Sequence, residues 1–169
     1  KRKLRFTTNH DETAKMSPIR EFGGERGSMA AFVISSYLHG GALIYSSQEV
    51  GHPERIDFFH NCPVDWSANS ALRREYETLM KLYNEYPAIR KGELKTYPGC
   101  DVFTFEKEAD GQRILVVVNV RDSNQAAVLP QAWKNHACTN LFTGESETLT
   151  ESLSLAPYEY RILKCQEIN

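Results

Sequence analysis

The sequence predicts an α/β segment followed by an antiparallel β-sandwich. In the first part, a strand-like run at 4–8 is followed by a helical pattern at 29–39 and a continuous apolar run at 42–45, which is the order of a βαβ unit. From Gly92 onward the pattern changes to short extended runs separated by turn residues, as is typical of an antiparallel sandwich. The boundary between the two parts is therefore expected near 91–92.

The first predicted strand carries polar residues at its carboxyl end. Leu4 and Phe6 fall on one face, and the threonines that follow favour extended backbone. Directly after them come Thr8-Asn9-His10-Asp11-Glu12, and no helix is expected for about 15 residues beyond them. Since α/β-barrel enzymes project catalytic side chains from the carboxyl ends of their strands, this run is a candidate site.

The predicted helix at 29–39 has Ser28 as a candidate N-cap and Gly40 as a left-handed stop. It is apolar on almost every side, so we expect it to be covered on more than one face. The apolar run at 42–45 shows no alternation, which favours a buried parallel strand. A long polar loop, 46–69, follows it.

A second helix is expected from Asn69 or Ser70 to about Tyr86, with one apolar stripe and charges opposite, and Pro87 is expected to end it. The remaining extended runs are at 102–105, 114–118, 141–142, 149, 153–155 and 158–163. The turn signals between them are Asp110-Gly111, 121–124 and 143–145.

Composition narrows the class of protein. The chain has 169 residues, of which 41% are hydrophobic and 25% charged, and its net charge is −2. These values are typical of a globular protein and predict no strong attraction to nucleic acid or to an anionic membrane. No apolar run reaches the roughly 18 residues of a membrane span. The four cysteines lack paired spacing, which disfavours a zinc site but leaves disulfides and the compartment open.

Four stretches, taken together, resemble one family. They are Arg5-Phe6-x-x-Asn9-His10-Asp11, Gly41-Ala42-Leu43-Ile44-Tyr45-Ser46-Ser47-Gln48-Glu49-Val50-Gly51, the run from Leu82-Tyr83 to Lys91-Gly92, and Leu155-Ala156-Pro157-Tyr158-Glu159. In this order they resemble the carboxyl-terminal part of the α-amylase family, the family 13 glycoside hydrolases. The resemblance implies that residues 1–91 form the last two strand-helix units, strands 7 and 8, of a (β/α)8 TIM barrel. It implies that residues 92–169 form the β-sandwich C-terminal domain.

The resemblance also implies a retaining glycosidase that uses three carboxylates on α-glucans such as starch, maltodextrin or related oligosaccharides. Asp11 matches the acid that stabilises the transition state, and His10 and Asn9 match residues that contact the sugar. Arg5 matches a supporting arginine below the strand. Glu49 either lines the cleft or braces its loop, and the sequence favours neither. Hydrogen bonds to ring hydroxyls that strengthen in an oxocarbenium-like transition state contribute several kcal/mol in such enzymes.

The sequence also departs from the family. The nucleophile and general-acid motifs, which the family carries on the fourth and fifth strands, do not occur in this chain. We therefore expect the isolated chain to be inactive and to associate with the remaining barrel segment or with a second copy of itself, because two strands cannot close a barrel. No cofactor or metal is expected on these residues. The calcium that relatives often bind would lie in the missing upstream part.

Two alternatives remain. The first is a non-catalytic carbohydrate-binding β-sandwich module, and the second is a non-catalytic amylase-fold partner protein. The sandwich lacks a conspicuous trio of exposed aromatics, which counts against the first, and an intact Asn9-His10-Asp11 counts against the second. Trp66 and Tyr97 are potential sugar-stacking residues, although a buried anchor is favoured for Trp66. The sequence leaves open hydrolysis against transglycosylation, as well as the linkage and the oligomeric state.

Overall fold

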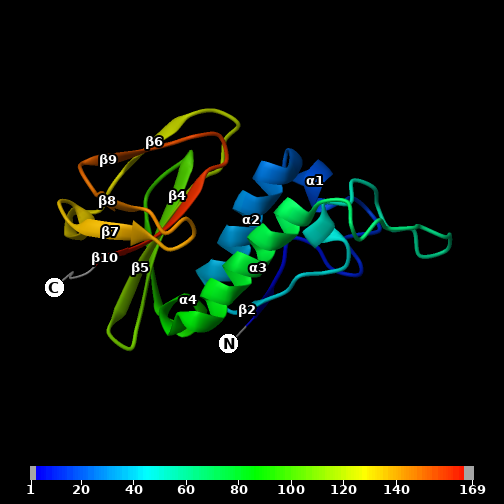
Figure 1. Cartoon of the computed structure of the whole chain (residues 1–169), viewed down its shortest axis with the longest axis horizontal. Coiled ribbons are helices and arrows are strands. Elements are labelled where there is room, and N and C mark those ends of the chain that lie inside the picture. Colours follow the sequence, from blue (N-terminus) through cyan, green and yellow to red (C-terminus); the bar gives the residue numbers. More distant parts are fainter. Residues whose placement is uncertain (1–2, 166–169) are drawn as a thin grey trace.

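The computed structural model describes residues 3–165 (Figure 1). Strand β1 (Leu4–Arg5) pairs in parallel with β2 (Gly41–Ala42), with Leu4 opposite Gly41. Helices α1 (Pro18–Glu21) and α2 (Gly24–Leu38) lie between the two strands in sequence. The expectation of no helix for about 15 residues after Glu12 was therefore wrong, because Pro18 is well suited to open the short helix α1. The expected strand–helix–strand order is therefore present. β2 is shorter than the expected run at 42–45. β1 is its only partner among the described residues, and the last hydrogen bond between them joins Leu43 N to Arg5 O at 3.0 Å.

Helix α2 begins earlier than the sequence suggested, at Gly24 instead of Met29. Its N-cap is Gly23 at φ 77°, a left-handed conformation that glycine adopts without steric cost. Ser28 lies inside the helix, where its hydroxyl donates to the Glu25 carbonyl at 2.9 Å. The serine was therefore misread as the cap.

Helix α3 (Ser70–Glu85) begins as expected, since the side chain of Asn69 accepts a hydrogen bond from Leu72 N at 3.0 Å. Pro87 follows its end and also starts α4 (Pro87–Lys91), because proline is well suited to the first position of a helix. A short 3-10 turn, η1 (Gln48–Val50), lies in the loop after β2.

The remaining chain forms two antiparallel sheets, as expected. The larger sheet has the strand order β3-β4-β5-β10-β7-β8, and the smaller one pairs β6 with β9. Their bounds are β3 Glu93–Tyr97, β4 Val102–Ala109, β5 Gln112–Asn119, β6 Gln125–Val128, β7 Ala137–Asn140, β8 Ser146–Thr148, β9 Ser152–Leu155 and β10 Tyr160–Cys165, with the 3-10 turn η2 at Gln131–Trp133. Helical structure thus gives way to strands between Lys91, at the end of α4, and Glu93, at the start of β3.

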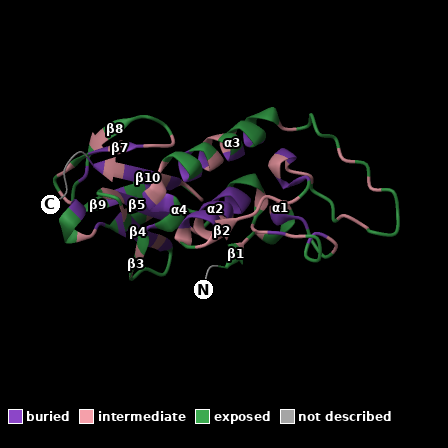
Figure 2. Cartoon of the chain, turned by 90° about the horizontal axis from the view of Figure 1, so that it is seen from below, coloured by how far each residue is buried: buried purple, intermediate pink, exposed green. Residues whose placement is uncertain are grey.

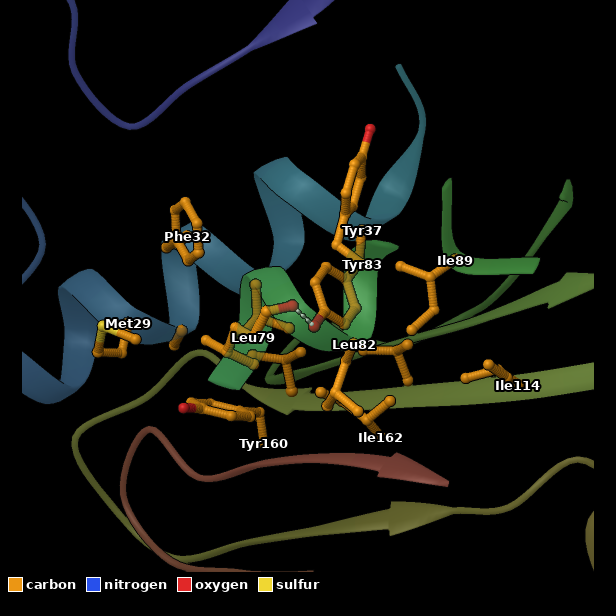
Figure 3. Packing of buried hydrophobic residues seen from close by; sticks show 14 of the residues in the cluster. Met29, Phe32, Tyr37, Leu79, Leu82, Tyr83, Ile89, Ile114, Tyr160 and Ile162 are labelled. Atoms are coloured by element: carbon orange, nitrogen blue, oxygen red, sulfur yellow. Dashed lines mark hydrogen bonds between the residues drawn. The ribbon is translucent and has the colours of Figure 1, made fainter. Parts of the chain in front are cut away.

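Two hydrophobic clusters hold these layers together. The first lies between the helices and one face of the larger sheet, where Met29, Phe32 and Tyr37 of α2 are fully buried (Figure 3). The second lies between the two sheets and contains Trp133. One broad side of the apolar helix is thus covered by other segments of this chain.

Polar contacts also fasten the helices to the sheet. Lys107 of β4 is fully buried, and its ammonium donates to the carbonyl of Leu38, at the end of α2, at 3.0 Å. Arg26 of α2 forms an ion pair with Glu75 of α3 at 2.8 Å, and the hydroxyl of Tyr160 on β10 also contacts Glu75. The end of α2, and with it the entry into β2, is therefore fixed by the sheet.

The structure shows which of the four cysteines are paired. Cys138 and Cys165 face one another on the paired strands β7 and β10 and form a disulfide, whereas Cys62 and Cys100 are free thiols. Among residues 3–165, no helix has the length and apolar character needed to cross a lipid bilayer.

Candidate active site

The turn that follows β1 is organised by Asn9. The Asn9 side-chain oxygen accepts hydrogen bonds from the backbone N–H groups of Asp11 and Glu12, both at 2.9 Å. The Asn9 carbonyl also accepts from Thr13 N at 3.0 Å. One side chain therefore satisfies two backbone donors and fixes the path of the chain through the candidate residues. The capping role of Asn9 was not foreseen from the sequence.

His10 and Asp11 project from this turn into solvent. Their side chains are 72% and 71% exposed, and His10 Nε2 lies 3.4 Å from an Asp11 carboxylate oxygen. The imidazole ring also lies beside Tyr45, with ring centroids 6.5 Å apart. Tyr45 follows β2, so the residues after two parallel strands meet here. The sequence signal for Tyr45 was its place at the end of the apolar run, but it was treated as strand only.

Gln48 links the residues that follow β1 to those that follow β2. It is buried, its side-chain oxygen accepts from Tyr45 N at 2.9 Å, and its amide nitrogen lies 3.3 Å from both Thr7 Oγ1 and the Tyr76 hydroxyl. These contacts link β1, the residues after β2, and α3. Gln48 therefore supports the surface on which His10 and Asp11 stand, a role that sequence reasoning did not assign.

Glu49 lies on the 3-10 turn η1 and is half-buried. One of its carboxylate oxygens is buried and accepts no hydrogen bond from the described residues. Burial raises the pKa of Tyr76 to about 12, and the nearby negative charge of Glu49 contributes to that rise. The Glu49 side chain makes no hydrogen bond within residues 3–165 that would brace the loop, and both roles that the sequence left open stay predictions.

Arg5 contacts the turn before β2. Its Nε donates to the carbonyl of His39 at 3.1 Å, and within residues 3–165 it forms no ion pair. Within the described residues, this hydrogen bond ties the last residue of β1 to the turn that leads into β2.

The loop after η1 is tied to the segment that carries the candidate residues. Ile56 N donates to the Thr13 carbonyl at 2.9 Å, and the Ser17 hydroxyl donates to the Pro53 carbonyl at 2.8 Å. Trp66, farther along this loop, is 53% exposed, so the buried-anchor interpretation was wrong. Among the described residues, no group of three His, Cys, Asp or Glu side chains is arranged to hold a metal ion.

The sheets contain a buried carboxylate, that of Glu106, and their described strands present no large exposed aromatic side chain on which a sugar could stack. Glu106 accepts hydrogen bonds from Trp133 Nε1 and the Tyr97 hydroxyl, both at 2.7 Å, and from Arg113 at 2.8 Å. Burial alone would raise the pKa of Glu106, but these three donors outweigh it and lower that pKa. Tyr97 is therefore committed to the interior network. In the described part of the two sheets, Val128 is the one large exposed hydrophobic side chain.

Comparisons with known proteins relate the chain to amylases. Residues 94–162 match the family model "Maltogenic Amylase, C-terminal domain". Alpha-amylase 2 of Dictyoglomus thermophilum is 24% identical over 174 residues, a match that covers 96% of this chain and 29% of the relative. The chain therefore spans less than a third of that protein.

Solved structures show the same fold. The α-amylase of Geobacillus thermoleovorans, in complex with acarbose, aligns with a TM-score of 0.77 at 16% identity and covers 99% of this chain and 40% of that one. AmyP E221Q, in complex with maltotriose, aligns with a TM-score of 0.72 at 17% identity and covers 86% and 35% of the respective chains.

Proposed function

Because the chain is a carboxyl-terminal part of a family 13 glycoside hydrolase, we propose that it contributes a substrate-binding and transition-state-stabilising surface to a retaining α-glycosidase. The substrate class is α-glucan, in keeping with the maltotriose and acarbose complexes of similar structures. In this proposal residues 1–91 are the last two strand-helix units of a (β/α)8 barrel, and residues 92–169 are its sandwich domain.

The observation that carries the proposal is the Asn9-capped turn at the carboxyl end of a parallel strand pair. It holds the Asp11 carboxylate and the His10 imidazole side by side, next to Tyr45. A carboxylate on a fixed turn accepts hydrogen bonds from sugar hydroxyls without reorganising during the reaction. These bonds strengthen as the ring becomes oxocarbenium-like, so Asp11 lowers the barrel enzyme's activation barrier and His10 orients the same ring.

The nucleophile and the general acid of this reaction lie outside the chain in our proposal. A retaining enzyme needs two carboxyl groups about 5 to 5.5 Å apart on either side of the scissile bond. The 169-residue chain alone should therefore release no reducing ends from maltooligosaccharides. Calcium, where the full-length protein binds it, would also be held by residues outside the chain.

Product stereochemistry tests the proposal in the full-length protein that carries this sequence. Proton NMR of the first product, recorded before mutarotation, should show the α anomer, since a double displacement retains configuration. Release of the β anomer would contradict the retaining mechanism. No turnover of any α-glucan by the full-length protein would favour the non-catalytic amylase-fold partner instead. The carbohydrate-binding sandwich has no exposed aromatic platform among the described sheet residues to support it.

A further inference from the structure

Apart from Phe6, which follows β1, the large exposed aromatic side chains of the described residues lie on one loop. Phe58 is 52% exposed, Phe59 is 91% exposed, and Trp66 follows on the same loop. Figure 2 shows this loop as the exposed segment that extends away from the sheets. A phenylalanine ring left almost wholly in water carries an unfavourable hydration cost, so its display favours a role in contact with a ligand or partner.

The turn that carries Phe59 has a defined local structure. One Asp57 carboxylate oxygen accepts from Phe59 N at 2.9 Å, and the other lies 2.8 Å from His60 Nδ1. The N–H of Asp57 itself donates to the sulfur of Cys62 at 3.2 Å. The pKa of Asp57 is lowered, chiefly by the Phe59 N–H and then by His60, so this carboxylate remains an acceptor at neutral pH. The turn thus holds the Phe59 backbone in place while its ring stays in solvent.

The same turn is fastened next to the candidate active site. Ile56, one residue before it, donates to the Thr13 carbonyl at 2.9 Å, and Thr13 N in turn donates to the Asn9 carbonyl at 3.0 Å. Two backbone hydrogen bonds therefore connect the turn that presents Asp11 with the start of the turn that presents Phe59. In Figure 1 both segments lie at the same end of the molecule, beyond α1.

We propose that Phe59 is a sugar-stacking residue, whose ring packs against the apolar face of a glucosyl unit in the α-glucan bound at His10 and Asp11. This inference rests on the proposed function and adds one further contact to that site. The C–H groups on one face of a pyranose form an apolar surface that an aromatic ring can cover while the hydroxyls remain hydrated. The Asp57 carboxylate holds the turn, and Phe59 makes the contact with the sugar.

Substitutions of Phe59 in the full-length protein test the proposal. Phe59→Leu keeps an apolar side chain but removes the flat ring, and Phe59→Trp keeps a flat ring. We expect Phe59→Leu to raise KM for maltoheptaose roughly 3- to 10-fold at unchanged kcat, and Phe59→Trp to stay near the parent. Val128→Ala truncates another highly exposed apolar side chain, on β6, and serves as the control, with no expected effect.

Binding of a thio-linked maltopentaose, which is not hydrolysed, separates this proposal from the proposed function. Calorimetry with this probe needs no turnover, so it reports on Phe59 even if the mechanism assigned to Asp11 fails. A dissociation constant of Phe59→Leu equal to that of the parent would overturn the stacking role. So would a Tm several degrees lower with unchanged KM, because that result would mean that the ring packs against protein outside this chain.

Discussion

Replacement of Glu106 by alanine should cost the chain a large part of its stability. The substitution removes the acceptor of three hydrogen bonds, from Trp133, Tyr97 and Arg113. Trp133 is fully buried, so its indole N–H would lose its partner without gaining water, at a cost of about 1–3 kcal/mol. Arg113 would also lose a nearly buried carboxylate. Breaking such a pair from one side typically costs about 3–5 kcal/mol in all.

Urea denaturation followed by circular dichroism measures this loss. We expect the free energy of unfolding to fall by about 3–5 kcal/mol in Glu106→Ala and by about half as much in Glu106→Gln, which keeps an acceptor oxygen. Glu108→Ala is the matched control: it lies on the same strand, is exposed, and approaches Arg113 only at 3.6 Å. Its cost should be below about 0.5 kcal/mol. A loss below about 1 kcal/mol in Glu106→Ala, or an equal loss in Glu108→Ala, would refute the reasoning.

Three further outcomes are expected. Reduction of the Cys138–Cys165 disulfide, which spans 27 residues, should lower the free energy of unfolding by roughly 3–4 kcal/mol, and an unchanged urea midpoint in dithiothreitol would contradict this. Burial lowers the pKa of Lys107 to about 8, so the unfolded state binds more protons above that pH and stability should rise from pH 8 to 10; in Lys107→Met that rise should be absent. The isolated chain exposes Leu4 and Phe6 beside the open edges of β1 and β2, so light scattering should show association that grows with concentration, whereas a monomer at every concentration would exclude it.

On the acid side, stability also rises with pH, in this case because of Glu106. The folded-state pKa of Glu106 lies below its unfolded value, so its contribution is complete above the unfolded value. That contribution is lost as pH falls through the lowered folded-state pKa. The urea midpoint of Glu106→Gln should therefore depend less on pH in this acidic range than that of the parent.

The sequence predicted the elements that rest on local signals. The amphipathic stripe of α3 and its Asn69 cap, the hairpin at Asp110-Gly111, and the apolar runs of the larger sheet all depend on residues close together in the chain. The start of α2 was placed at the wrong residue because glycine gives no cap side chain to recognise. Trp66 was expected to be buried but is exposed. The burial of an aromatic side chain depends on segments that are distant in the sequence, and a local pattern does not contain them.

The sequence predicted which residues form the candidate site better than it predicted the contacts that position them. The position of His10 and Asp11 after a strand followed from the pattern, but the hydrogen bonds of Asn9 depend on how the turn closes. Gln48 and Tyr45 reach the site only because β1 and β2 pair in parallel over 36 intervening positions or more. A pairing of this kind is a tertiary contact, so no window of local sequence carries it.

The kinetics of Asp11→Asn in the full-length protein test the central claim most directly. The substitution preserves the shape of the side chain and the Asn9-capped turn, while it removes the negative charge that tightens on the sugar in the transition state. We predict a fall in kcat on maltoheptaose of about 10²–10³-fold with little change in KM and Tm, and a smaller fall in His10→Ala. A kcat of Asp11→Asn within about twofold of the parent would contradict the placement of Asp11 in the active site.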